Sequence, residues 1–328
     1  MHTDALTYRG HIHTESDSMH DHETSVMARL RGAGKRYGAV VALDGVDLAL
    51  RGGEVHALLG ANGAGKTTAI ALLLGLLQAD AGDVELFGAA PQSLHARRGA
   101  GTMLQSTLLQ ETLQVRELLD LTRSYYPDPR SVADCVALAG LDGLMQRRYG
   151  KLSGGQQRRV QFALAICGRP RVLFLDEPTT GLDIEARQGL WRAIRELVAQ
   201  GSAVLLTTHY IEEAEALADR VTVLAHGRVV AAGAMHEVRA RVSQRRIRCI
   251  STLDVDTVAT WPQVRHAQRD GECIDVIVES AEDVVRRLLA EDPGLRELEI
   301  QRAGLADAFL EITRDTNPEP QSALQEAA

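Results

Sequence analysis

Residues 60–68 read Gly-Ala-Asn-Gly-Ala-Gly-Lys-Thr-Thr and stand between two apolar segments. This spacing of glycines before a Lys-Thr pair is the pattern of a phosphate-binding loop that joins a buried strand to a helix. Residues 55–59 have the composition of that strand, and residues 68–77 have that of the buried helix. The pattern therefore predicts an α/β fold with a nucleotide-binding loop at its centre.

The loop has the chemistry that a triphosphate requires. Gly60, Gly63 and Gly65 allow backbone turns that a Cβ forbids and a close approach to an anion. The loop amides and the N-terminus of the next helix then offer positive partial charge to phosphate oxygens. Lys66 is expected to reach the β- and γ-phosphates, and the Thr67 hydroxyl is expected to hold Mg²⁺. A glycine-rich turn of purely structural purpose is the alternative.

Size and charge limit the classes of function. A length of 328 residues suggests about two domains. The longest apolar run, residues 69–77, is far shorter than the roughly 18 to 20 residues that span a bilayer, so the chain is not expected to cross a membrane by itself. A net charge of -8 argues against an extended nucleic-acid-binding face, and no nucleic-acid partner is predicted.

The cysteines and the two ends of the chain add further expectations. Four cysteines lie far apart without Cys-x-x-Cys spacing, which indicates reduced thiols in a cytosolic protein. Residues 1–27 hold five of the eleven histidines among acidic residues, and they have no signal-peptide pattern. They are predicted to form a disordered tail, with adventitious metal binding as the alternative. Residues 317–328, with two prolines, are predicted to be disordered as well.

Two domains are expected between these tails. The first, residues 28–240, has a β-layer over 28–50 before the phosphate loop and a helical insertion at about 106–165. An arginine-rich stretch around residues 235–246 indicates a boundary. Residues 245–316 contain four strand-like segments and a helical segment at 281–290, which predicts a small α+β domain.

Asp176, Glu177 and Pro178 close the apolar run that begins at Val172. Such a run fits a buried strand in a parallel sheet, and the carboxyl ends of these strands are where open α/β sheets bind ligands. Adjacent side chains on a strand point to opposite faces, so the two carboxylates serve one site only if the strand bends or ends there. Pro178 favours an ending. An exposed acidic strand terminus is the alternative.

Together these motifs resemble the ATP-binding subunit of an ATP-binding-cassette (ABC) transporter over about residues 28–238. The most specific element is Leu-Ser-Gly-Gly-Gln at residues 152–156, the signature of the family, between a phosphate loop and an Asp-Glu strand. The resemblance implies an ATPase with ATP and Mg²⁺ as cofactors. It also implies a P-loop NTPase cassette with a RecA-like core, an antiparallel β-layer and an inserted helical subdomain.

The resemblance assigns roles residue by residue. Tyr37 matches the aromatic residue that stacks on adenine, and Gln105 matches the glutamine that joins the Mg²⁺ site to the helical insertion. Asp176 matches the acid that holds Mg²⁺, Glu177 the base that polarises the attacking water, and His209 the histidine that contacts the γ-phosphate. The residues expected at the nucleotide are Tyr37, Gly60, Asn62, Gly63, Ala64, Gly65, Lys66, Thr67, Thr68, Gln105, Ser153, Gly154, Gly155, Gln156 and Asp183, with Thr67, Gln105 and Asp176 at the metal and Lys66, Glu177 and His209 in catalysis.

The signature predicts a second anion site. Ser153 and the amides of Gly154 and Gly155 are expected to start a helix, which attracts an anion in its own right. One chain needs only one such site for its own phosphates. The family places ATP between the phosphate loop of one subunit and the signature of its neighbour, with Asp183 in the loop that crosses to the other subunit. The resemblance therefore implies a homodimer with two ATP molecules.

The resemblance also implies a membrane partner. With no spanning helix expected in the chain, the permease would be a separate subunit, and residues 105–115 are a candidate surface for it. The chain is then expected to be cytoplasmic and peripheral on the cytoplasmic face of the membrane. Residues 115–121, 179–183 and 305–310 resemble the exporter branch that pairs with ABC-2 type permeases. An importer ATPase and an ABC ATPase without transport function are the alternatives.

Overall fold

The structure, a computed structural model, describes residues 26–105, 108–208, 210–241 and 245–302. His209, residues 305–310 and almost all of both expected tails lie outside these ranges. The prediction that the N-terminal tail extends to residue 27 is wrong, because Val26 and Met27 belong to the first strand. Val26 pairs with Arg51, and the Met27 carbonyl accepts a hydrogen bond of 2.7 Å from the Phe87 amide.

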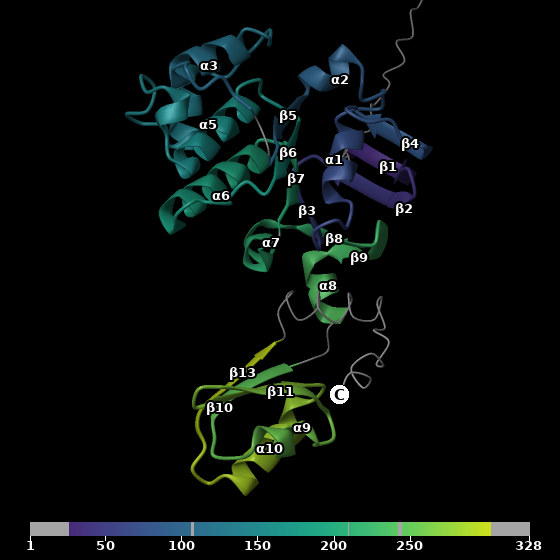
Figure 1. The fold of residues 1–328 in the computed structure, drawn as a ribbon, viewed down its shortest axis with the longest axis vertical. Helices are drawn as coiled ribbons and strands as arrows, with labels where there is room; N and C mark the ends of the chain where they lie inside the picture. The colour runs from purple at the N-terminus through teal and green to yellow at the C-terminus, as the bar shows by residue number, and fades with distance from the viewer. Residues whose placement is uncertain (1–25, 106–107, 209, 242–244, 303–328) are drawn as a thin grey trace, which may run out of the picture.

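A six-stranded sheet forms the centre of the cassette, residues 26–241 (Figure 1). Its first four pairings are parallel and its last is an antiparallel hairpin. The strand order is β5 (Ala100–Met103), β6 (Val172–Asp176), β7 (Ala203–Thr207), β3 (Val55–Gly60), β8 (Arg220–Ala225) and β9 (Arg228–Ala234). Every residue of β3, β6 and β7 is buried, as expected for parallel strands that are covered on both faces.

The two faces of this sheet carry different layers. Alternating residues of β6 show this, because Leu173 and Leu175 join one hydrophobic cluster whereas Val172 and Phe174 join another. The first cluster includes α5 (Gly154–Ile166) and α6 (Ile184–Ala199), and the second includes α1 (Lys66–Leu73) and the β-layer. Figure 1 shows these layers to the left and right of the sheet. The β-layer has the order β2 (Val40–Arg51), β1 (Val26–Tyr37) and β4 (Ala81–Leu86).

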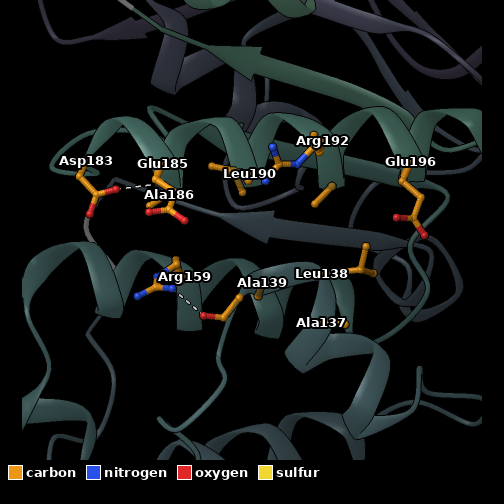
Figure 2. A pocket seen from close by; sticks show the side chains of 13 residues that line it. Ala137, Leu138, Ala139, Arg159, Asp183, Glu185, Ala186, Leu190, Arg192 and Glu196 are labelled. Atoms are coloured by element: carbon orange, nitrogen blue, oxygen red, sulfur yellow. Dashed lines mark hydrogen bonds between the residues drawn. The ribbon is translucent and has the colours of Figure 1, made fainter.

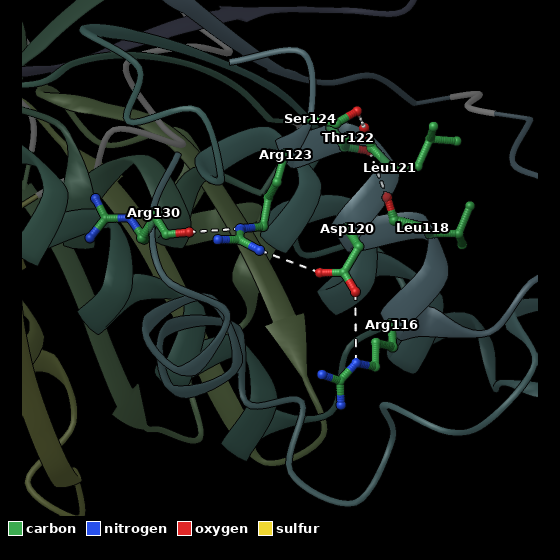
Figure 3. Close-up of polar contacts among 8 residues, drawn as sticks. All are labelled: Arg116, Leu118, Asp120, Leu121, Thr122, Arg123, Ser124 and Arg130. Carbon is green, nitrogen blue, oxygen red and sulfur yellow. Dashed lines mark hydrogen bonds and ion pairs between the residues drawn. The ribbon is translucent and has the colours of Figure 1, made fainter. Parts of the chain in front are cut away.

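The expected helical insertion is formed by α3 (Val115–Arg123), α4 (Val132–Ala139), a 3₁₀ turn at Tyr149–Lys151 and the first part of α5. Polar contacts join α3 to the loop before α4 (Figure 3). Asp120 bridges Arg116 at 3.7 Å and Arg123 at 3.3 Å, and the Arg123 Nε donates to the Arg130 carbonyl at 2.9 Å. The side chains of α3 thus hold the turn that leads into α4.

Three short helices complete the cassette: α2 (Leu94–Arg98), α7 (Ile211–Leu217) and α8 (Met235–Arg241). In the part of the chain that the structure describes, no helix is long and apolar enough to span a bilayer. All four cysteines are free thiols, and three of them are buried.

The C-terminal part has its own sheet and its own core. The elements are β10 (Arg245–Ile250), α9 (Val255–Ala259), β11 (Val264–Asp270), β12 (Cys273–Val278), α10 (Ala281–Glu291) and β13 (Arg296–Arg302). The antiparallel order β11-β12-β10-β13, read with the βαββαβ sequence of elements, is that of a ferredoxin-like fold. Ile247, Ile274, Val276, Trp261 and Leu288 fill the core between the sheet and the two helices. The predicted strands and the predicted helix are present, whereas α9 is an addition.

Candidate nucleotide site

The phosphate loop connects the end of β3 to the start of α1, as the sequence predicts. Gly63 and Gly65 have φ values of 80° and 107°, which a side chain would disfavour. A Cβ on Gly60 would lie 2.6 Å from the Leu224 carbonyl oxygen, and one on Gly65 would lie 2.5 Å from that of Ala42. No side chain caps α1, so the first amides of the helix remain available to an anion. The loop is therefore a cradle that fits phosphate.

Lys66 lies in this cradle with only 8% of its surface exposed. Its Nζ donates to the carbonyl of Gly60 at 2.6 Å and to that of Ala61 at 3.0 Å. Burial lowers the pKa of Lys66, and the negative charges of Glu177 and Asp176 oppose this shift. The ammonium group is thus kept at the mouth of the loop by neutral backbone oxygens.

Asp176 and Thr67 are adjacent at the end of β6 and the start of α1. The Thr67 hydroxyl lies 3.5 Å from Asp176 Oδ2, and Asp176 Oδ1 accepts a short hydrogen bond from the Thr207 hydroxyl. Asp176 is 3% exposed. One carboxylate beside one hydroxyl suits Mg²⁺, which binds few protein ligands and completes its shell with water and substrate phosphates. The side chains present therefore fit the metal that the sequence implies.

Glu177 has a left-handed backbone, with φ of 48°. Such a conformation costs a non-glycine residue about 1–3 kcal/mol and persists only where the surroundings hold it. Its amide donates to the Thr207 carbonyl at 3.0 Å, and its Oε2 accepts from Gln105 Nε2 at 3.3 Å and from the Thr180 hydroxyl at 3.4 Å. Strand β6 ends at Asp176, as predicted, and the turn at Glu177 replaces the strand alternation that would have separated the two carboxylates.

Arg158 is a site residue that the sequence pattern does not reveal. It stands in α5, and its guanidinium reaches the carbonyls of Leu104, Asp176 and Glu177. Burial lowers the pKa of Arg158, and the carboxylates of Asp176 and Glu177 oppose this shift. In the sequence it follows two glutamines and precedes Arg159, so nothing local distinguishes it from its neighbour.

The signature forms the N-terminus of α5. The Ser153 side chain accepts from the Gln156 amide at 3.3 Å, and Gln156 Oε1 accepts from the Ser153 amide at 3.1 Å, which is a capping box. The helix begins at Gly154, directly after Ser153. Ser153 is exposed, and α5 lies on the face of the sheet opposite to α1 (Figure 1).

The other predicted residues lie outside the cluster formed by the phosphate loop and the end of β6. Tyr37 ends β1 and is 49% exposed, and Asp183 caps α6 by accepting from the Ala186 amide at 2.8 Å. Hydrogen bonds connect Thr67 with Asp176 and Gln105 with Glu177. Among the described residues, no hydrogen bond joins Tyr37 or Ser153 to these two pairs. His209 lies outside the described ranges.

Two grooves lie next to the site. One of about 580 Å³ runs between α6 and the two helices α4 and α5 (Figure 2), and it is lined by charged residues that include Arg159, Asp183 and Arg192. It contains no phosphate-loop residue, so it is not the nucleotide site. The other, of about 450 Å³, is lined by Gln105, Leu108 and other residues between the end of β5 and α5.

Comparison with known proteins gives the family. The family described as ABC transporter matches residues 43–180. The Nod factor export ATP-binding protein I of Burkholderia orbicola is 38% identical over 296 residues, which cover 86% of this chain and 95% of that relative. The chain belongs to the ABC transporter family. This ABC ATPase is also 42% identical over 228 residues to the daunorubicin resistance ATP-binding protein DrrA3 of Streptomyces coeruleorubidus, covering 66% of this chain and 71% of DrrA3.

Solved structures agree with this assignment. The ATP-binding subunit of an ABC transporter matches with a TM-score of 0.61 and 28% identity over 66% of this chain and 92% of that structure. The dimeric bacterial ABC transporter cassette MJ0796 matches with a TM-score of 0.58 and 25% identity, over 63% of this chain and 98% of the cassette. The same cassette is also known in a post-hydrolysis state bound to ADP and phosphate. The predicted P-loop cassette fold and ATPase activity are thereby confirmed.

Proposed function

We propose that two copies of this ABC ATPase enclose two ATP molecules and so power an exporter whose membrane-spanning part is a separate subunit. The observation that carries this proposal is the presence of two helix N-termini in one chain, an uncapped one at Lys66 and the signature helix at Gly154, on opposite faces of one sheet. Each is an anion site, and one triphosphate bound in one chain would use only the first. A second copy supplies the missing half, as the dimeric cassette MJ0796 suggests by analogy.

Within each composite site, the residues of one copy have distinct tasks. Lys66 binds the β- and γ-phosphates. Thr67 and Asp176 would hold Mg²⁺, which would neutralise phosphate charge. Glu177 polarises the attacking water, Gln105 keeps the Glu177 carboxylate in place, and Tyr37 stacks on the adenine. The remaining contacts come from the loop amides of residues 60–68 and His209, and from Ser153, Gly154, Gly155, Gln156 and Asp183 of the other copy.

Export is the direction that the relatives favour, since one is named for Nod factor export and another for daunorubicin resistance. The groove of about 450 Å³ beside Gln105 gives a membrane subunit a place to dock. Leu108 at its edge is fully exposed, and an exposed apolar side chain at a groove suits a protein partner. The ABC ATPase would then work at the cytoplasmic face of the membrane.

The dimer is tested with Glu177→Gln, which removes the base and keeps the shape of the side chain. With ATP and Mg²⁺ this variant is expected to accumulate as a dimer with two ATP molecules in sedimentation or size-exclusion measurements. Lys66→Ala in the same background is the control and should stay monomeric. A Glu177→Gln chain that binds ATP and remains monomeric would contradict the proposal.

A mixed dimer tests whether the two half-sites come from different copies. Chains with Glu177→Gln are combined, one carrying Lys66→Ala and the other Ser153→Ala. Only one interface site then has both an intact Lys66 and an intact Ser153, and the mixture is expected to trap one ATP per dimer although neither variant alone traps any. Retention of ATP by the Ser153→Ala chain alone would show that its signature is not required.

A further inference from the structure

Arg158 is bound to more backbone around the proposed catalytic centre than any side chain described above. Its Nη1 donates to the Leu104 carbonyl at 3.1 Å, and its Nη2 donates to the Asp176 carbonyl at 3.0 Å and to that of Glu177. These carbonyls belong to the residue before Gln105 and to the two acidic residues. One guanidinium therefore touches the backbone of both segments that carry the Gln105–Glu177 hydrogen bond.

The left-handed turn at Glu177 explains how one nitrogen reaches two consecutive carbonyls. In a regular strand, consecutive carbonyls point to opposite sides, so a single donor could not serve both. With φ of 48° at Glu177 the chain leaves the strand direction, and the Asp176 and Glu177 carbonyls both reach Nη2. In this conformation Arg158 contacts the carbonyl groups on both sides of the Glu177 N–Cα bond, the bond about which φ is measured.

The guanidinium is also fixed from the side of the signature helix. Nη1 donates to Gln161 Oε1 at 2.9 Å, and Gln161 Nε2 donates to the Tyr149 hydroxyl at 2.9 Å. Gln161 and Tyr149 are both buried, with exposures of 8% and 4%. Arg158 thus moves with α5, and α5 is the helix whose N-terminus carries Ser153.

We propose that Arg158 is a positioning residue that holds Glu177 in its left-handed conformation and links that conformation to the placement of the signature helix. A shift of α5 relative to the sheet would displace the carbonyls of Asp176, Glu177 and Leu104, because all three are hydrogen-bonded to the planar guanidinium of Arg158. In the proposed dimer, the signature of one copy faces the nucleotide bound by the other copy. A movement of that signature would thereby change the position of Glu177 in the same copy, next to the nucleotide that this copy binds. This inference rests on the proposed role of Glu177 as the base.

The test compares Arg158→Gln and Arg158→Lys with Arg159→Gln in the full chain. Arg159 is a matched control on the same helix, because its Nη1 donates to the Gly140 carbonyl inside the helical insertion. Lysine keeps the charge but lacks the planar fork that serves several acceptors. Steady-state ATPase measurements give kcat and KM, titration with a fluorescent ATP analogue gives binding, and thermal melting gives stability.

Both Arg158 variants are expected to lower kcat, by roughly 100-fold for Arg158→Gln, because small displacements of a catalytic group cost about this much. The KM for ATP and the binding of the analogue should stay at the level of Arg159→Gln, since the phosphate loop is untouched. If Arg158→Gln does not fold, Arg158→Lys decides the question alone.

Two results would overturn the inference. Either the Arg158 variants turn over ATP like Arg159→Gln, or they lose ATP binding and melting temperature in step with kcat, as a general packing defect would. Glu177→Gln separates this inference from the proposed function. If that variant hydrolyses ATP normally, the assigned base is wrong. If it is inactive while the Arg158 variants remain active, only the linkage through Arg158 fails.

Discussion

His56 makes the stability of the cassette depend on pH in a defined window. It lies near the start of β3, is 5% exposed, and its Nε2 is 2.8 Å from the Thr222 hydroxyl. Burial lowers its pKa to about 4 from the usual 6.5, with a smaller contribution from the charge of Arg220. Because the folded state resists protonation, the unfolded chain takes up a proton first as the pH falls.

The size of the effect follows from this shift. The contribution of neutral His56 is fully present above pH 6.5 and is lost progressively down to pH 4. At 1.36 kcal/mol for each pKa unit, the total is about 3 kcal/mol, of which about 2 kcal/mol is lost by pH 5. This is a large share of the stability of a typical domain, about 5–15 kcal/mol.

Urea unfolding of the wild type and of His56→Gln between pH 7 and pH 5 measures this contribution. Glutamine keeps a hydrogen-bonding group toward Thr222 but does not titrate, so the free-energy difference between the two proteins should change by about 2 kcal/mol in favour of the variant. His95→Gln, at an exposed position of α2, is the matched control for the loss of a histidine. A difference between wild type and His56→Gln that stays constant across this range would refute the reasoning.

Other substitutions test the packing and the signature. Gly101→Ala would push a Cβ against the Ala165 carbonyl and within 2.9 Å of the Leu173 side chain, so the melting temperature should fall by an amount equivalent to about 1–3 kcal/mol. Gly189→Ala is the opposite case, because its Cβ would meet nothing closer than 3.9 Å on α6, and the melting temperature should rise slightly. Ser153→Ala removes an exposed cap worth about 1 kcal/mol, so melting should change little while ATPase activity falls sharply; equal losses in both would assign Ser153 a structural role only.

The sequence predicts the parts of this molecule that are encoded locally. The phosphate loop depends on glycines at fixed positions, and the position of Asp176 follows from an apolar run that ends in carboxylates and a proline. The cap at Ser153 is equally local, since Gln156 completes the capping box three residues later. In the C-terminal domain, the four strands and the longer helix, α10, follow from the pattern of apolar residues in their own segments.

Other features depend on contacts between distant segments. The role of Arg158 arises because α5 packs beside the ends of β5 and β6, and its acceptors lie 18, 19 and 54 residues away along the chain. The left-handed backbone of Glu177 is unexpected for a glutamate, since it is maintained by Thr207, Arg158 and the sheet rather than by its own preference. The start of β1 at Val26, two residues before the predicted start, depends on pairing with Arg51 on the opposite strand of the hairpin.

The carbonyl oxygens that hold Lys66 determine what nucleotide entry must displace. The Lys66 ammonium group donates hydrogen bonds to the carbonyl oxygens of Gly60 and Ala61, which carry partial charges and no formal negative charge. A phosphate that binds at the loop therefore competes with weak neutral acceptors. The Lys66 ammonium group is already oriented toward the loop and partly desolvated. Nucleotide binding is then an exchange of neutral backbone oxygens for phosphate oxygens around the Lys66 nitrogen.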